Sequence, residues 1–200
     1  MAKYKMILDL DTGVDDALAI AYATGSPEVD LIGILASYGN NLRDVCAQNS
    51  LDLLNLLHQK QVPVYPGATH SGTTSTFSVM KVSKQIHGDN GIGDVSLPSS
   101  SRSVEKGSAV DFIIKAAHQY GKDLIIVPTG PMTNLAAAIK KDPSIVNEIG
   151  NVTFMGGALT VPGNVSATAE ANIHQDPKAA DLVMRSGLPL TMVGLDVTMQ

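Results

Sequence analysis

The sequence contains no tryptophan, a single cysteine and only 4% aromatic residues. Proteins that bind single-stranded nucleic acids stack bases on aromatic side chains, so this composition argues against that class. The formal net charge is −5 and no basic cluster is present, which also disfavours a nucleic acid or an anionic membrane as partner. The one cysteine, Cys46, has no second cysteine to pair with, as is typical of proteins in a reducing compartment.

Long apolar runs are also absent. No stretch approaches the roughly 20 apolar residues that a membrane-spanning helix needs. The apolar run at residues 4–8 is too short for a signal peptide and leads directly into acidic residues. We therefore expect a soluble, cytoplasmic protein that does not associate with membranes.

Short apolar runs and helix-forming stretches alternate along the 200 residues, which is the length of one domain. The runs bounded by turn residues predict buried strands, at residues 4–8, 29–36, 62–65, 123–127, 152–155 and 190–193. Between them we expect helices at residues 17–23, 42–58, 108–120 and 176–186, and one that begins at Pro131. Repeated strand–helix units predict a single α/β domain over residues 1–200, with a doubly wound, mostly parallel sheet and helices on both faces, as in a Rossmann-like core.

Four acidic residues lie together where the first expected strand passes into the first expected helix: Asp9, Asp11, Asp15 and Asp16. Any one of them could simply cap the helix or face solvent. Four carboxylates this close repel one another, and a bound cation would remove most of that cost. Oxygen ligands alone suit Ca²⁺ or Mg²⁺ rather than zinc. The cluster therefore favours a hard-cation site at a strand end.

Further polar residues follow other expected strands or lie in two stretches with no clear period, residues 66–106 and 156–175. Long stretches of this kind are often binding loops, although mobile surface is the simpler interpretation. The residues concerned are Asn40, Thr129, His87, Asn164, Glu170 and Asn172. Each has an ordinary structural interpretation alone, but together they would surround a cation with groups that bind a polyhydroxyl ligand.

Seven segments carry a resemblance to a known family: residues 9–17, 38–40, 86–88, 127–134, 155–157, 164–177 and 191–198. In this order they resemble the N-terminal part of the calcium-dependent nucleoside hydrolases, the inosine-uridine-preferring ribohydrolases. The first segment is specific, whereas the others are weak alone and strong as a series. One departure is Thr12, where the family commonly has proline, and we expect little effect from it.

The resemblance implies a Ca²⁺ ion held by the side chains of Asp11 and Asp16 and by the backbone carbonyl of Thr129, with Asp11 also acting as general base. It implies that ribose hydroxyls bind Asp15 and Asn40, and that the substrate further contacts Asn164, Glu170, Asn172 and Met155. His87 would lie near the base, and Asp9 would support the site structurally. A homo-oligomer, dimer or tetramer, is expected.

The activity that the resemblance implies is hydrolysis of the N-glycosidic bond of ribonucleosides, as part of nucleoside salvage. The sequence around His87 resembles the inosine-uridine and pyrimidine group more than the purine-specific group. The purine-specific group uses tryptophan in its site, and this chain contains none. The family continues beyond the matched residues, and its last third brings a further aspartate to the calcium and a histidine to the leaving base. We expect the chain to lack that C-terminal part.

Two other functions are compatible with the residues. A haloacid-dehalogenase-type, Mg²⁺-dependent phosphatase would use Asp9 and Asp11 as its nucleophile and acid, with Asp89 and Asp94 imitating its later acidic motif. A non-catalytic protein that binds nucleosides would use the same site without turnover. Phosphate-ester hydrolysis would identify the first, and binding without base release the second.

Overall fold

The computed structural model describes residues 4–199, and its centre is a six-stranded sheet. The strands are β1 (Tyr4–Leu10), β2 (Val29–Ala36), β3 (Val64–Pro66), β4 (Leu124–Pro128), β5 (Asn151–Met155) and β6 (Leu190–Val193). Their spatial order is β3-β2-β1-β4-β5-β6, and every neighbouring pair is parallel. The predicted doubly wound α/β fold is confirmed.

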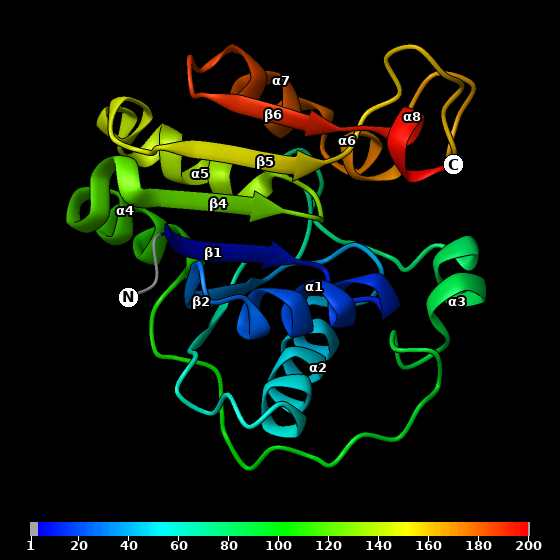
Figure 1. Ribbon diagram of the computed structural model, residues 1–200. Helices are drawn as coiled ribbons and strands as arrows, with labels where there is room; N and C mark the ends of the chain where they lie inside the picture. The colour runs from blue at the N-terminus through cyan, green and yellow to red at the C-terminus, as the bar shows by residue number, and fades with distance from the viewer. Residues whose placement is uncertain (1–3, 200) are drawn as a thin grey trace.

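The helices are α1 (Val14–Gly25), α2 (Arg43–Leu56), α3 (Lys81–His87), α4 (Ala109–Tyr120), α5 (Thr133–Lys141), α6 (Ala171–Gln175), α7 (Pro177–Arg185) and α8 (Leu195–Thr198). Most of them connect strands and lie against one of the two faces of the sheet, whereas α3 lies beyond the carboxyl ends of the strands and α8 follows the last strand (Figure 1). Two 3₁₀ helices, η1 (Gly121–Asp123) and η2 (Pro143–Asn147), precede β4 and β5. Within residues 4–199, no helix combines the length and the apolar character needed to cross a bilayer.

Strand β1 faces a separate apolar core on each side. Ile7 packs in a cluster built with α4, α5 and α7, whereas Leu8 and Leu10 pack in a cluster built with α1 and α2. Successive side chains of a strand point to opposite faces, so a strand buried on both faces is a continuous apolar run. The same alternation places Asp9 and Asp11 on the face to which Ile7 points.

The structure differs from the sequence predictions in two connections. The stretches at residues 66–106 and 156–175, for which no helix was predicted, contain α3 and α6. Helix α3 is only seven residues long, has no side-chain N-cap and leaves Val82 and Ile86 exposed, so it carries no apolar period. Helix α5 begins at Thr133 after the N-cap Met132, so Pro131 precedes the first turn rather than lying in it.

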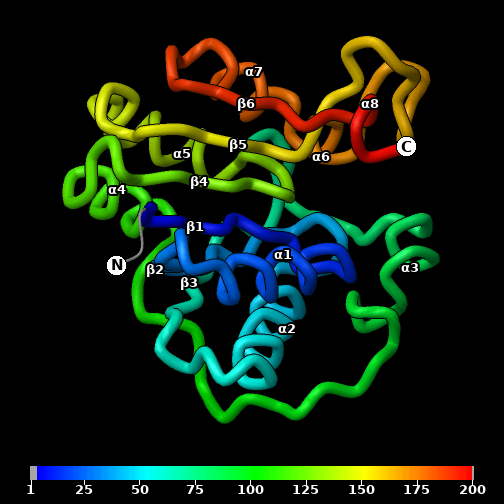
Figure 2. The backbone as a smooth tube through the Cα atoms, viewed as in Figure 1, coloured from blue at the N-terminus to red at the C-terminus, as the bar shows by residue number. Residues whose placement is uncertain are grey.

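The long segment after α3 passes along the end of α2 before it reaches α4 (Figure 2). Two asparagines hold its beginning. Asn41 Nδ2 donates to the Asp89 carbonyl at 3.0 Å, and Asn49 Nδ2 of α2 donates to the Asn90 carbonyl at 2.9 Å. These bonds fix the chain directly after His87, the last residue of α3.

Candidate functional site

The strand order reverses direction between β1 and β4, because β2 follows β1 on one side of the sheet and β5 follows β4 on the other. Ligands of doubly wound sheets bind outside the carboxyl ends of the strands at such a point. Asp11 directly follows β1 and Thr129 directly follows β4, and the Thr129 amide donates to the Asp9 carbonyl at 3.0 Å. Both residues therefore lie at the reversal point.

Asp11 is 1% exposed and lies between backbone segments that have no room for a side chain. The Asn40 amide donates to its Oδ2 at 2.7 Å. Its Oδ1 is buried and has no hydrogen-bond partner among the described residues. A Cβ on Gly39 would collide with Oδ2, and a Cβ on Gly130 would lie 3.0 Å from Oδ1. One carboxylate oxygen is therefore fixed and the other is free to bind a ligand.

Asp16 lies in the first turn of α1 and is also buried. Its Oδ2 accepts the Gly13 amide at 2.7 Å, and its Oδ1 accepts the Thr129 hydroxyl at 2.6 Å. Burial, with repulsion from Asp15, raises the pKa of Asp16 to about 7. Burial, followed by repulsion from Asp16, raises the pKa of Asp11 well above its usual range. Two buried carboxylates that resist ionisation together favour a cation between them.

Asp9 is buried on the same face of the sheet and binds α5. Its Oδ1 accepts Asn134 Nδ2 at 2.8 Å, and Asn134 Oδ1 in turn accepts the Ala68 amide at 2.8 Å. Burial raises the pKa of Asp9 to about 7. Asp9 thus connects β1 through Asn134 to the loop that follows β3.

His87, the last residue of α3, contacts the start of α1. The Val14 amide donates to its Nδ1 at 3.2 Å, and the same nitrogen lies 3.8 Å from Oδ1 of the exposed Asp15. Burial lowers the pKa of His87, although Asp15 opposes the shift. A ring nitrogen that accepts a backbone N–H carries no proton, so the proton of the neutral ring lies on Nε2.

The β4–β6 half of the sheet contributes two side-chain amides and a carboxylate. Asn172 Nδ2 donates to the Thr129 carbonyl at 2.7 Å and to the Met155 carbonyl at 3.1 Å. Glu170 is buried as the N-cap of α6, and its carboxylate accepts the amides of Gly157, Asn172 and Ile173. Asn164 is exposed, and its Oδ1 accepts the Ala171 amide at 3.0 Å. These side chains are held before any ligand binds.

One cavity of about 570 Å³ joins these residues. Its polar lining includes the predicted residues Asp15, Asn40, His87, Thr129, Asn164, Glu170 and Asn172, together with Met155. Asp9, Asp11 and Asp16 are buried and do not line it. Its apolar lining was not predicted and includes Val14, Leu18, Val82, Ile86, Leu195 and Met199. The available signal was the apolar spacing of α1, where Val14 and Leu18 lie four residues apart on one helix face.

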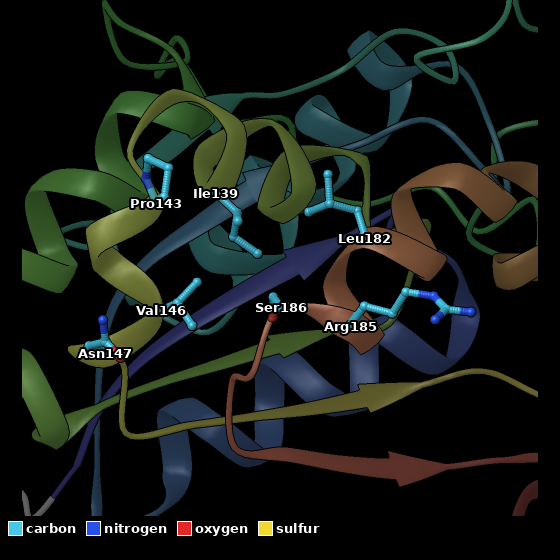
Figure 3. A pocket seen from close by; sticks show the side chains of 7 residues that line it. All are labelled: Ile139, Pro143, Val146, Asn147, Leu182, Arg185 and Ser186. Atoms are coloured by element: carbon cyan, nitrogen blue, oxygen red, sulfur yellow. The ribbon is translucent and has the colours of Figure 1, made fainter.

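A second cavity, of about 500 Å³, lies between α5, η2 and α7. Figure 3 shows its lining, which is mainly aliphatic and comes from Ile139, Pro143, Val146, Asn147, Leu182, Arg185 and Ser186. The only cation in this lining, Arg185, is paired with Asp181 at 2.6 Å. The lining contains no carboxylate and no imidazole, so the first cavity is the better candidate for chemistry.

Residues 6–200 match the family model described as inosine-uridine preferring nucleoside hydrolase. The chain belongs to this family. Uridine nucleosidase 1 of Arabidopsis thaliana is 39% identical over 196 residues, which are 98% of this chain and 57% of that protein. Pyrimidine-specific ribonucleoside hydrolase RihA of Salmonella schwarzengrund is 36% identical over 193 residues, which are 96% of this chain and 60% of that protein.

Solved nucleoside hydrolase structures have the same fold. A purine-preferring ribonucleoside hydrolase from Gardnerella vaginalis has 60% identity and a TM-score of 0.97, with coverage of 98% of this chain and 62% of that one. A plant nucleoside hydrolase has 36% identity and a TM-score of 0.95, with coverage of 98% and 61%. The chain thus spans about three fifths of the length of the relatives that it matches.

The residues at the reversal point of the sheet have the chemistry that a hard cation requires. Among residues 4–199, no three His, Cys, Asp or Glu side chains are grouped as metal ligands, so the site offers two carboxylates and backbone oxygens. The unpartnered Oδ1 of Asp11 fits a hard cation. The Thr129 carbonyl accepts one hydrogen bond from Asn172 and keeps a second lone pair. The donor set is all oxygen, as such an ion requires.

The phosphatase alternative has no support in a nucleoside hydrolase fold. Asp89 and Asp94 lie in the loop after α3, not at the end of a strand. There the Asp94 Oδ1 accepts the amides of Asp89 and Asn90 and closes a local turn. The Asp89 carboxylate is paired with Lys84 of α3 at 3.0 Å, so both carboxylates already have local partners.

Proposed function

We propose that the protein hydrolyses the N-glycosidic bond of ribonucleosides and releases ribose and the free base. The observation that carries this proposal is the buried Asp11 Oδ1, which has no partner among the described residues, beside Asp16 at the reversal point of the sheet. The proposal is also supported by the similarity to a uridine nucleosidase of Arabidopsis thaliana and to a purine-preferring ribonucleoside hydrolase of Gardnerella vaginalis.

The proposed cofactor is Ca²⁺, held by Asp11, Asp16 and the carbonyl of Thr129. When bound, this ion would fix a water molecule in place and lower its pKa. Oδ1 of Asp11 would accept the proton of the attacking water, because Oδ2 is already engaged by the Asn40 amide. Asp11 is therefore the proposed catalytic base.

Cleavage of an N-glycosidic bond builds positive charge on the ribose, as it does in glycoside hydrolysis. The carboxylates of Asp11, Asp15 and Asp16 would stabilise that charge. Asp15 and Asn40 would bind ribose hydroxyls from one side, and Asn164, Glu170 and Asn172 from the other. Glu170 already accepts three amides, and a carboxylate has about four acceptor sites. It would therefore accept one hydroxyl and orient it rigidly.

The leaving base would lie near His87, whose neutral ring would donate from Nε2. Met155 and the aliphatic lining of the cavity would contact the flat base without aromatic stacking. We propose a preference for inosine and uridine or other pyrimidine nucleosides, supported by the names of the Arabidopsis and Salmonella relatives. A purine preference is the second candidate, favoured by the 60% identity to the purine-preferring Gardnerella protein.

The test is release of base from uridine, cytidine, inosine and adenosine, with Ca²⁺ and with a chelator. We expect turnover that chelation abolishes and Ca²⁺ restores, and loss of turnover in Asp11→Asn. The ranking of the four substrates separates the two base preferences. Binding of uridine without any base release would instead identify a non-catalytic nucleoside-binding protein.

We further propose that the protein works in nucleoside salvage in the cytoplasm, as a homodimer or homotetramer. The single thiol, Cys46, is buried in α2. Exposed apolar side chains outside the cavity lining, such as Tyr22 of α1 and Leu56 of α2, would be covered by a second copy. Light scattering of the purified protein would give the oligomeric state, and cell fractionation the location.

A further inference from the structure

A buried hydroxyl pair joins the acidic segment to α2. Thr12 lies between Asp11 and Gly13, and its Oγ1 is 2.7 Å from Ser50 Oγ of α2, 38 positions further along the chain. Both residues are fully buried.

The direction of this hydrogen bond follows from the other bond of Ser50. Ser50 Oγ donates to the Cys46 carbonyl at 3.0 Å, one helical turn before it in α2. A hydroxyl has one hydrogen, and a carbonyl can only accept. Ser50 therefore accepts from Thr12, and the chain of bonds runs from Thr12 to Ser50 to the Cys46 carbonyl.

We infer that the Thr12–Ser50 hydrogen bond is a positioning element for the two carboxylates of the proposed calcium site. Thr12 is flanked by Asp11, whose side chain is a proposed ligand, and by Gly13, whose amide donates to Asp16 Oδ2 at 2.7 Å. A shift of Thr12 would therefore displace both carboxylates, and the bond to α2 prevents that shift. The Thr12–Ser50 hydrogen bond would thus restrain the backbone between the two acidic residues. This inference rests on the proposed function.

The two partners are not equivalent. Ser50→Ala leaves the buried Thr12 hydroxyl without an acceptor, and an unpaired buried donor costs more than a lost bond. Thr12→Val keeps the side-chain shape and leaves Ser50 satisfied by Cys46. A positioning role therefore predicts that Thr12→Val affects the site without affecting the fold, whereas Ser50→Ala affects both.

The experiment measures Ca²⁺ affinity by calorimetry, melting temperature, and hydrogen exchange of the Gly13 amide in metal-free protein. For Thr12→Val we expect about tenfold weaker Ca²⁺ binding, the lower end for residues that orient metal ligands, faster Gly13 exchange and an unchanged melting temperature. Ser50→Ala should also melt earlier. Thr12→Ser keeps the hydroxyl and should restore both affinity and exchange.

Thr24→Val is the matched control, because the Thr24 hydroxyl donates only to carbonyls of its own helix, those of Ile20 and Ala21. Parent-like Ca²⁺ affinity and Gly13 exchange in both Thr12→Val and Ser50→Ala would overturn the inference. If the parent protein binds no Ca²⁺, the proposed cofactor is wrong, and Gly13 exchange alone decides whether the hydrogen bond positions the segment.

Discussion

The Thr129 hydroxyl donates a 2.6 Å hydrogen bond to Asp16 Oδ1 across 113 positions of the chain. It joins the first turn of α1 to the end of β4. The same threonine offers its carbonyl on the other side, where Asn172 donates to it at 2.7 Å. Side chain and backbone of one residue therefore have separable roles.

That separation gives the first prediction. Asp16→Asn should weaken Ca²⁺ binding at least tenfold, because it removes a charged ligand from a hard cation. Thr129→Val deletes the hydroxyl but keeps the proposed ligand, the carbonyl, and should weaken binding much less. Calorimetric titration of the parent and both variants measures the difference. Equal affinity of Asp16→Asn and the parent would remove Asp16 from the ligand set.

The second prediction concerns the 2′-hydroxyl of the substrate. A site built to hydrogen-bond a hydroxyl leaves its polar groups unpaired when the hydroxyl is missing, so kcat/KM for uridine should exceed that for 2′-deoxyuridine by roughly 10²-fold or more. Asn40→Ala should lower uridine turnover and narrow this ratio. Comparable kcat/KM for the two nucleosides in the parent would contradict the assignment of Asp15 and Asn40.

A third prediction follows from the space around Asp11. Gly39→Ala places a Cβ against Oδ2 and should displace the carboxylate, at a cost of about 1–3 kcal/mol in unfolding free energy. Ca²⁺ binding should weaken as well. Gly25→Ala is the control, since its added Cβ meets no atom within 4 Å beyond its chain neighbours and the backbone of its own helix. Urea unfolding and calcium titration report the two effects, and parent-like values for Gly39→Ala would show that Asp11 adapts to the methyl group.

The fourth prediction is a pH dependence of stability. His118 is bound through Nδ1 to Glu148 and through Nε2 to Asp142, both at 2.9 Å. The bond to Glu148 makes the larger contribution and the bond to Asp142 the next, and together they raise the pKa of His118 above its usual value of 6.5. A raised folded-state pKa gives stability that is fully present below the unfolded value, and that stability is lost as pH rises through the folded value. His118→Gln should therefore lower the urea midpoint more at about pH 5.5 than at about pH 9.

The control for His118→Gln is His174→Gln, because His174 is exposed and makes no ion pair with any described residue. It should change the midpoint equally at both pH values. The linkage argument fails if the difference between parent and His118→Gln is the same at both pH values.

The strands could be predicted closely because each is a short, largely apolar run bounded by turn residues. This holds for the buried ends of β1 and β2 and also for the edge strand β6, where Thr191 and Met192 are exposed. Strands β2 and β6 have the predicted bounds, and β1 extends two residues further, to Leu10. The short helices could not be predicted in the same way. Helix α6 is capped by Glu170, which is not among the usual N-cap residue types. Its start depends on Gly157 and the end of β5, which are close only in the folded chain.

The site was predictable in part for a related reason. Parallel strands end at one edge of a sheet, so Asp11, Asn40 and Thr129 could be placed together before any geometry was known. Their individual hydrogen bonds could not be predicted from the sequence, because each depends on a partner that is distant along the chain. The burial of Asp9, Asp11 and Asp16 below the cavity, and the occupation of Glu170 by backbone amides, are examples.

The reversal of strand order also divides the candidate site between two halves of the sheet. The β1–β3 half holds Asp11, Asp16 and His87, and the β4–β6 half holds Thr129 and Glu170. Neither half contains a whole site, so the site exists only while β1 and β4 are paired in the sheet. A ligand that contacts both halves would stabilise the pairing of β1 with β4, since it binds the joined sheet and not the separated halves. Amide protection along β1 and β4 should then rise with ligand concentration, because ligand binding would stabilise the pairing of these two strands.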